Sequence, residues 1–434
     1  MTIPGVIAFG VFALLLLSLL RRDTDAFSPA RLFGLLWSGA IGLAELKLSA
    51  YQHEWSLYSW LVFLAGIAAL LLGLATAAIL RPPIDFLSVA EVRARLRQHG
   101  QSKIHHKKLF WTIVILFAAY STAYGIETVI EGTVPLFSAR PDILRVSFGV
   151  FGLHLIVNAM MGIVILAVEY MLVVPASEGR RGTVGFIIFL LVASYFLLLQ
   201  RYTFFVVGVI VLAMAYYTTR WVRPRNAFPF VAAFVVGLFM INQIRAARYI
   251  QEYVYYLSKM KFSKDLWFLA EPYMYIVMNL ENFARAVDKL DHHFYGYFTF
   301  DWILALTGLK HWLAEYFQIE RLPFLISGYN TYAFHWWYYY DFGILGVGIF
   351  PFVTGLVIGL LYSRLRTVPD PLTLVFYAAS VLVIVVSYIM NPLNRLDFVS
   401  NLILLWFVHR FVIDKGEGRR YEGTGPLSVP AAGA

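Results

Sequence analysis

Apolar residues in this chain are gathered into long uninterrupted runs. A helix needs about 20 predominantly apolar residues to cross the hydrocarbon core of a membrane, and the chain contains eleven candidate runs. The pattern therefore predicts an all-α polytopic integral membrane protein with about eleven transmembrane helices. The runs lie near 4–20, 32–48, 57–80, 109–126, 148–173, 184–200, 202–219, 227–243, 342–363, 371–390 and 398–413.

Lysine and arginine residues are distributed unequally between alternate loops of this arrangement. The loops of one set carry 20 of these residues, whereas the short loops of the other set carry five. Because cytoplasmic loops of membrane proteins are enriched in Lys and Arg, we predict that the basic set is cytoplasmic. The N-terminus is then extracytoplasmic and the C-terminus cytoplasmic, an orientation that needs an odd number of spans.

The predicted spans divide the chain into four parts. Residues 1–243 hold the first eight spans, residues 342–413 hold the last three, and residues 414–434 form a cytoplasmic tail that we expect to be disordered. Between the eighth and ninth spans lies a large extracytoplasmic loop, 244–341. In 249–340, 28 of 92 residues are aromatic, too apolar a composition for a solvated linker. We therefore predict a helical loop that lies on the membrane surface or folds back over the bundle.

The composition agrees with an integral membrane protein and excludes several kinds of site. Of the 434 residues, 60% are hydrophobic and 14% are charged, as expected for a chain in lipid. The net charge of +9 arises in loops that flank apolar runs, so it encodes membrane orientation and does not indicate nucleic-acid binding. The chain has no cysteine, which excludes disulfides, Fe–S clusters and Cys-bound zinc. The one Asp-x-Asp motif, Asp23-Thr24-Asp25, falls in a predicted cytoplasmic loop, and we predict no metal site.

Four arginines are predicted at the extracytoplasmic face, beside or between apolar runs. An arginine at membrane depth is costly unless it has an anionic partner, and its planar guanidinium binds phosphate oxygens through two parallel hydrogen bonds. Convergence of these residues would therefore create a site for a lipid-linked phosphate or diphosphate. The alternative is that each side chain extends to the interface and binds lipid headgroups. The four residues are Arg201, Arg245, Arg248 and Arg395.

Three titratable residues near the same face are candidates for proton transfer. Glu271 lies in a hydrophobic stretch that would raise its pKa and suit it to general-base catalysis, or it caps the helix that Pro272 begins. His335 lies in the aromatic stretch before the ninth span. Asp341 lies at the mouth of that span, where a carboxylate is expected to be functional or paired with an arginine.

The region around the ninth span resembles a known family of membrane enzymes. The motif Gly328-Tyr329-Asn330-Thr331-Tyr332, the later Tyr340-Asp341-Phe342-Gly343 and the glycine-rich span after them are similar to the signature of the O-antigen (Wzy-type) and oligosaccharide repeat-unit polymerases. The early stretch Phe27-Ser28-Pro29-Ala30-Arg31-Leu32-Phe33 and the junction residue Arg201 also resemble that family, as does a large extracytoplasmic loop late in the chain. The chain departs from the pattern at Ala333 and Trp336-Trp337, where many relatives carry Thr and an Arg-Pro pair.

This resemblance implies a GT-C-like fold and a metal-independent glycosyltransferase without a cofactor, in the bacterial inner (cytoplasmic) membrane. The implied substrate is an undecaprenyl-diphosphate-linked oligosaccharide. The enzyme would transfer the growing chain from its lipid diphosphate onto a fresh lipid-linked repeat unit, to build O-antigen, capsule or exopolysaccharide. Further partners would be membrane lipids and a chain-length regulator protein.

The same resemblance suggests roles for the candidate residues. The four arginines would neutralise the diphosphate, which makes it a good leaving group without a metal. A base, Glu271 or His335, would take the proton of the acceptor hydroxyl, and Asp341 would position an arginine. The residues that would orient the substrate are Tyr329, Asn330 and Tyr332.

Other functions are compatible with the sequence. An O-antigen ligase uses the same donor and differs only in its acceptor, which these residues do not reveal. A lipid-linked oligosaccharide flippase or other transporter would line a translocation path with the arginines, but the repeated halves that are common in transporters are not found in the sequence. A non-catalytic envelope-assembly protein would not need clustered arginines.

Overall fold

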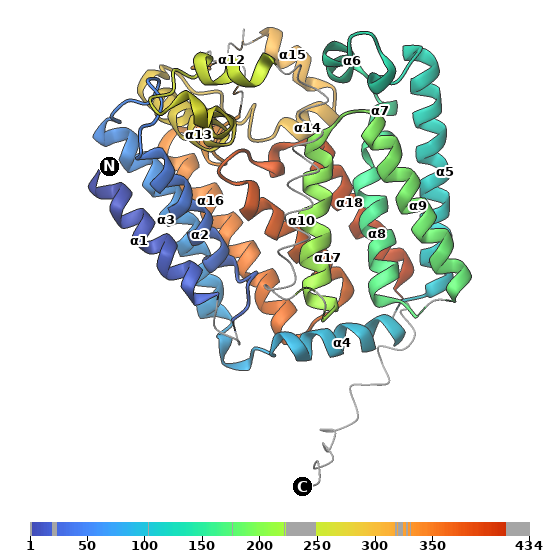
Figure 1. Cartoon of the computed structure of the whole chain (residues 1–434). Coiled ribbons are helices and arrows are strands. Elements are labelled where there is room, and N and C mark those ends of the chain that lie inside the picture. The colour runs from blue at the N-terminus through green and yellow to red at the C-terminus, as the bar shows by residue number, and fades with distance from the viewer. Residues whose placement is uncertain are drawn as a thin grey trace.

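The computed structural model describes residues 2–19, 24–102, 104–175, 177–220, 222, 249–316, 319, 324–326, 329 and 331–413. Throughout these residues the regular structure is helical, so the chain is all-α as predicted. Five helices are long and apolar enough to cross a membrane, and three shorter helices are also apolar. The structure is therefore consistent with a polytopic membrane protein (Figure 1).

The apolar helices pack side by side in one bundle (Figure 1). Ten of the predicted spans coincide with a helix or a pair of helices, and the eighth, 227–243, lies outside the described residues. The helices of the bundle are α1 (Ile3–Ser18), α2 (Pro29–Ala44), α3 (Leu57–Leu80), α5 (His106–Glu131), α7 (Leu153–Asn158), α8 (Met160–Val173), α9 (Glu178–Leu197), α10 (Arg201–Thr218), α16 (Trp336–Thr367), α17 (Pro371–Val386) and α18 (Leu396–Val412). Shorter elements in the connections are η1 (Pro83–Asp85), η2 (Pro135–Phe137) and α6 (Pro141–Ser147).

Two spans differ from the sequence pattern. The fifth begins at Leu153, later than predicted, because Gly149 and Gly152, with φ angles of 129° and 79°, form a turn before α7. The ninth is part of a longer helix, since α16 begins at Trp336, and its aromatic first turn is buried against other rings. Asp341 therefore lies inside α16, just before a kink at Gly343, whose φ is 61°.

Helices α3 and α16 approach closely because glycines face the partner backbone. A Cβ atom at Gly73 would lie 2.1 Å from the Phe352 carbonyl oxygen, and one at Gly355 would lie 2.1 Å from the Leu70 carbonyl oxygen. Any larger residue would force the helices apart. Gly73 and Gly355 therefore allow the close packing of α3 and α16.

Residues 249–316 form a cap over one end of the bundle, which we call the cap end (Figure 1). Helix α13 is amphipathic and buries Met274, Val277 and Leu280, and it packs against α2 and α3. A segment that folds back over the bundle is one of the two arrangements expected for this region. The elements of the cap are α12 (Tyr249–Leu257), η3 (Lys264–Leu269), α13 (Ala270–Lys289), α14 (Asp301–Leu306) and α15 (Leu309–Tyr316).

Helix α4 (Val89–Ser102) crosses the opposite end of the bundle, which we call the α4 end (Figure 1). Its Val92 and Leu96 side chains are fully buried. Arg93 Nε and Arg97 Nη2 donate hydrogen bonds to the carbonyl oxygens of Tyr216 and Thr218, at 2.9 and 3.2 Å. These carbonyls belong to the last turn of α10, which has no intrahelical donors for them. The arginines of α4 therefore complete the end of α10.

A buried ion pair joins three helix ends at the α4 end. Asp25 accepts hydrogen bonds from Arg366 Nη1 at 2.7 Å, from Tyr217 Oη at 2.8 Å and from Tyr362 Oη at 3.0 Å. The side chains of Asp25 and Arg366 are 6% and 12% exposed. Asp25 precedes α2, Tyr217 lies at the end of α10 and Arg366 at the end of α16. This member of the Asp-x-Asp motif is therefore a structural anchor.

Candidate functional site

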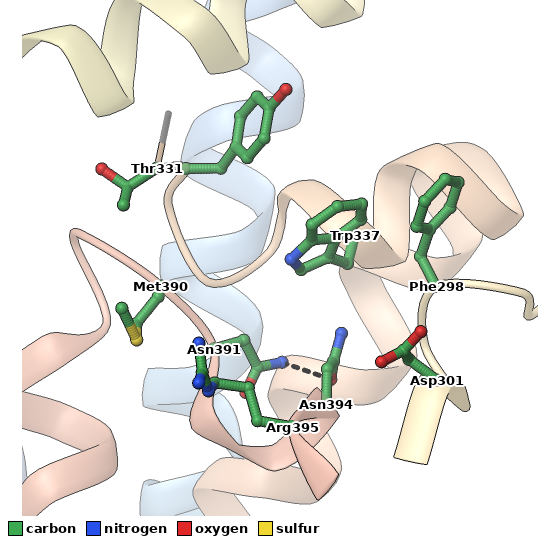
Figure 2. Close-up of a pocket in the computed structure, with 9 residues that line it drawn as sticks. Phe298, Asp301, Thr331, Trp337, Met390, Asn391, Asn394 and Arg395 are labelled. Carbon is green, nitrogen blue, oxygen red and sulfur yellow. Dashed lines mark hydrogen bonds between the residues drawn. The ribbon is translucent and has the colours of Figure 1, made fainter. Parts of the chain in front are cut away.

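A cavity of about 170 Å³ opens at the cap end of the bundle. Three segments enclose it: the start of α14 with the residues before it, the stretch that leads into α16, and the loop between α17 and α18 (Figure 2). Its lining combines hydrogen-bond donors, acceptors and aromatic faces. The lining residues are Phe298, Asp301, Thr331, Tyr332, Trp337, Met390, Asn391, Asn394 and Arg395.

The loop between α17 and α18 turns around Asn391 and contains the 3-10 turn η4 (Pro392–Asn394). The Oδ1 atom of Asn391 accepts a hydrogen bond at 3.1 Å from the backbone N–H two residues later. Its Nδ2 atom donates to Tyr338 Oη at 2.7 Å and to Asn394 Oδ1 at 2.9 Å. Both asparagines are buried. These bonds hold the loop against α16 and bring the next residue, Arg395, to the cavity.

Asp397 and Tyr202 orient the Arg395 guanidinium. Its Nε and Nη2 atoms donate to the two carboxylate oxygens of Asp397 at 3.0 and 2.7 Å. The guanidinium also lies 4.8 Å from the centre of the Tyr202 ring, a cation–π contact. Nη1 has no hydrogen-bond partner among the described residues, and the side chain is 47% exposed. Arg395 is therefore held by the protein while one edge is available to a ligand.

The stretch before α16 forms a second wall of the cavity. Its backbone pairs with the end of α17, since the N–H of Tyr332 donates to Ile389 O at 3.0 Å and that of Phe334 donates to Ser387 O at 2.7 Å. On the cap side, Thr331 Oγ1 donates to the side-chain oxygen of Asn279 in α13. This wall is thus fixed to both the bundle and the cap.

Aromatic rings cover much of the same wall. Tyr332 stacks on Trp336 with ring centres 3.7 Å apart. Trp337 stacks on Phe298, which precedes α14, at 4.6 Å. Flat ring faces beside polar groups suit a ligand that has both apolar and hydroxyl surfaces, as a sugar ring does.

Asp301 is the first residue of α14 and supplies a carboxylate to the cavity. Its Oδ1 atom forms an ion pair with Lys310 Nζ of α15 at 2.6 Å. The sequence pattern did not single out Asp301, Asn394 or Asp397. Asn394 and Asp397 could have been found from the cluster of polar residues in 391–397, between two apolar runs.

Of the four predicted diphosphate ligands, the structure describes the side chain of Arg395. Arg201 is the first residue of α10. The following residue, Tyr202, contacts Arg395, so the N-terminus of α10 lies beside the Arg395 guanidinium. The side chain of Arg201 and the whole of Arg245 and Arg248 lie outside the described residues. The diphosphate role of all four stays a prediction.

Asp341 has backbone partners, and no arginine in the described part of the chain forms an ion pair with it. Its fully buried carboxylate accepts hydrogen bonds from the N–H of Phe298 at 3.2 Å and from the N–H of Thr299. Its carbonyl oxygen accepts from the N–H of Tyr295 at 3.1 Å. The loop before α14 turns these two amides toward the carboxylate, and the predicted role of Asp341 in positioning an arginine stays a prediction. Asp341 therefore fixes the loop that carries Phe298.

His335 is enclosed by aromatic rings and does not line the cavity. Its ring centre lies 4.3 Å from that of Phe283, 5.4 Å from that of Phe63 and 5.7 Å from that of Trp37. Burial lowers the pKa of His335 to about 3, so the imidazole is neutral. Neither ring nitrogen has a hydrogen-bond partner among the described residues. This enclosed position does not favour the predicted role in proton abstraction, which requires contact with the substrate.

The remaining candidates are Glu271 and the three predicted substrate-orienting residues. Glu271 lies in the first turn of α13, where a carboxylate stabilises the helix start. The Tyr329 ring is buried against Tyr275, with ring centres 5.2 Å apart, and is not part of the cavity lining. Of the predicted substrate-orienting residues, Tyr332 lines the cavity and Asn330 lies outside the described residues.

No protein-family model, characterised protein or solved structure matches this chain. In the part of the chain that the structure describes, no group of three or more His, Asp or Glu side chains is arranged to hold a metal ion.

Proposed function

We propose that the chain is a GT-C-like glycosyltransferase that polymerises oligosaccharide repeat units linked to undecaprenyl diphosphate. The observation that carries the proposal is the cavity at the cap end, where Arg395, the Asp301 carboxylate and aromatic faces lie together. A guanidinium binds phosphate oxygens, aromatic and amide groups bind a sugar ring, and a carboxylate takes a proton. A reaction between glycans on lipid diphosphates needs all three.

Arg395 and the start of α10 are suited to the diphosphate. The Nη1 edge of Arg395 is available to a ligand, as described above. Helix α10 begins beside it at Arg201, and the free N–H groups and dipole of a helix N-terminus favour an anion. Arg245 and Arg248 would add positive charge. Together these groups would stabilise the leaving diphosphate in place of a metal ion.

The proposed reaction is a displacement at the anomeric carbon of the growing chain. A hydroxyl oxygen of the fresh lipid-linked unit forms the new glycosidic bond. The bond between the anomeric carbon and the diphosphate oxygen breaks, and its electron pair leaves on the diphosphate. A base takes the hydroxyl proton, so neither an oxidant nor a cofactor is needed.

The proposed orientation puts the cap end on the extracytoplasmic side of the bacterial inner (cytoplasmic) membrane, with about eleven spans. It is supported by exposed basic residues at the α4 end, among them Arg95, Lys108 and Arg364. Cytoplasmic surfaces of membrane proteins are enriched in such residues. The cavity would then face the compartment in which lipid-linked glycans are joined.

Reconstitution tests this proposal. Purified full-length protein in proteoliposomes receives lipid-linked oligosaccharide extracted from membranes of the source bacterium, and the products are sized on a gel. The wild type should give a ladder that survives a metal chelator, and Arg395→Ala should remove it. The matched control is Arg364→Ala, which removes a 57% exposed arginine that pairs with Asp370 at the α4 end. Its ladder should equal that of the wild type.

Other results would replace the proposal. An unchanged ladder in Arg395→Ala, or no ladder from folded wild-type protein, would contradict it. Transfer of the glycan only when lipid A-core is supplied would identify a ligase. Movement of labelled lipid-linked oligosaccharide across the vesicle membrane without a new glycosidic bond would identify a transporter.

A further inference from the structure

The cavity contains a buried hydrogen-bond donor that has no partner among the described residues. This donor is the Nδ2 atom of Asn394, whose side chain lines the cavity and is 6% exposed. A buried amide N–H without a partner destabilises the folded state, and native proteins rarely keep one without a functional reason. A ligand oxygen placed here would satisfy it.

The surrounding hydrogen bonds fix the direction of the Asn394 amide. The backbone N–H of Leu393 can only donate, so the Asn391 atom that it contacts is the oxygen Oδ1. The other terminal atom of Asn391 is then the nitrogen Nδ2, which donates to Asn394 Oδ1. The remaining terminal atom of Asn394 is therefore its nitrogen. Asn394 must present a donor to the cavity.

The charges of the cavity are balanced by their neighbours. Arg395 pairs with Asp397, and Asp301 pairs with Lys310. The two ion pairs together carry no net charge, and Asn394 is uncharged. A neutral ligand with several hydroxyls can donate to Asp301 and accept from Asn394, and Nη1 of Arg395 stays available to the diphosphate. The lining thus favours a neutral polyhydroxylated molecule.

The size of the cavity suits a single ring. Its volume of about 170 Å³ is smaller than the roughly 300–1,000 Å³ of sites that enclose a drug-sized ligand. Trp337 supplies an aromatic ring to the wall, and the side chains of Asp301 and Asn394 supply an acceptor and a donor (Figure 2). Tyr332 also lines the cavity. One sugar ring would use each of these groups.

We infer that the cavity is the acceptor subsite of the enzyme. It binds one neutral sugar ring, of which one oxygen accepts a hydrogen bond from Asn394 Nδ2 and the attacking hydroxyl lies next to Asp301. This inference rests on the proposed glycosyl transfer. The O–H bond of that hydroxyl breaks and its proton goes to the Asp301 carboxylate. The hydroxyl oxygen forms a bond to the anomeric carbon of the donor. The bond between that carbon and the diphosphate breaks, and its electron pair leaves on the diphosphate at Arg395.

Asn394→Asp tests the binding part of the inference. The substitution keeps the oxygen that Asn391 contacts and exchanges the donor in the cavity for an acceptor of the same shape. In proteoliposomes with lipid-linked oligosaccharide extracted from the source membranes, we expect the KM for the acceptor to rise about tenfold or more with little change in kcat. An unchanged KM in a variant with wild-type unfolding temperature would overturn the subsite.

Asp301→Asn tests the proton transfer. We expect kcat to fall about 10²- to 10⁴-fold, whereas the KM for the acceptor changes little. The matched control is Lys310→Gln, which breaks the same ion pair but keeps the carboxylate, and it should retain most of the turnover. Equal losses in the two variants would show that Asp301 only anchors α15, and the base assignment would be overturned.

Two sets of results separate the acceptor subsite from the polymerase reaction. A wild-type ladder that needs Arg395, together with wild-type kinetics in Asn394→Asp and Asp301→Asn, would overturn the acceptor subsite and keep the polymerase. A second probe is the free oligosaccharide, released from the same lipid extract by mild acid and followed by tryptophan fluorescence quenching. Quenching that Asn394→Asp abolishes, in a folded protein that makes no ladder, would keep the sugar subsite and overturn the polymerase.

Discussion

The molecule contains two arginine–aspartate pairs with the same closest distance and different surroundings. In each pair an arginine Nη atom lies 2.7 Å from an aspartate Oδ2 atom: Arg366 with Asp25 at the α4 end, and Arg395 with Asp397 at the cap end. The first pair is buried, and its carboxylate also accepts hydrogen bonds from two tyrosines. The second pair is 47% and 27% exposed and lies at a cavity.

This difference separates an arginine that stabilises the fold from one that can bind a ligand. Loss of one partner in a buried pair leaves an uncompensated charge in the protein interior, whereas an exposed pair contributes little to stability. Changes at the α4 end should therefore act on folding. Changes at the cap end should act on the proposed reaction.

Asp25→Ala should have the largest effect on stability. Arg366 would lose its carboxylate partner, and Tyr217 and Tyr362 would lose their acceptor, so we expect a loss of about 3–5 kcal/mol in the free energy of unfolding. Thermal unfolding of purified protein in detergent measures it. Asp397→Ala is the matched variant and should lose less than about 1 kcal/mol. Equal losses would remove the distinction between the two pairs.

Arg395→Lys should act on the reaction and leave stability nearly unchanged. The substitution keeps a positive charge at the cavity but removes the planar fork that holds Asp397 and that would present an edge to the proposed diphosphate. We expect the initial rate in proteoliposomes to fall about 100-fold, with little change in unfolding temperature. A fully active variant would show that charge alone is sufficient at this position.

Tyr217→Phe should have an intermediate effect on stability. It removes the hydroxyl that donates to Asp25 and keeps the ring, so we expect a loss of about 1.5–3 kcal/mol, as for a hydrogen bond to a charged group. Tyr202→Phe is the control at the cap end, because the Tyr202 hydroxyl has no hydrogen-bond partner among the described residues. It should be nearly neutral when unfolding temperatures are compared.

Glu281→Gln should have the smallest effect, visible as a pH dependence. Burial raises the pKa of Glu281 above its usual 4.5, although Lys47 and Trp55 lower it in part. Folding then favours the protonated form, so the stabilisation from Glu281 is fully present below its unfolded pKa and is lost as pH rises through the folded pKa. The unfolding temperature of Glu281→Gln relative to wild type should therefore increase between about pH 4 and pH 7. A difference in unfolding temperature that stays constant over this pH range would contradict the raised pKa of Glu281.

Most helices of the bundle could be predicted because a membrane imposes a requirement that is local in sequence. A run of apolar residues long enough to cross lipid has few other uses, and the predicted span 57–80 has the bounds of α3. The start of α16 was harder to predict, because Trp336 and the tyrosines after it are typical of a membrane interface. In the structure these residues are buried against other rings, a contact that no local pattern contains.

The candidate site was predictable only in part, because its residues meet through contacts that no local sequence pattern contains. Arg395 and Tyr332 could be selected by the cost of a charge near lipid and by a family resemblance. Asp301 lies far from Asn394 in the sequence, and the two line one cavity only after the cap has folded over the bundle. The polar residues of 391–397 are typical of any tight turn. Asp25 was expected to be an ordinary loop residue, because its partner Arg366 comes from the other half of the chain.

An electron cryomicroscopy structure of the protein in nanodiscs with extracted lipid-linked oligosaccharide would show where the substrate binds. We expect diphosphate density within hydrogen-bond distance of Arg395 Nη1, and a sugar ring in the cavity between Asn394 and Asp301. Substrate density elsewhere, with the cavity at the cap end unoccupied at saturating substrate, would contradict the proposal.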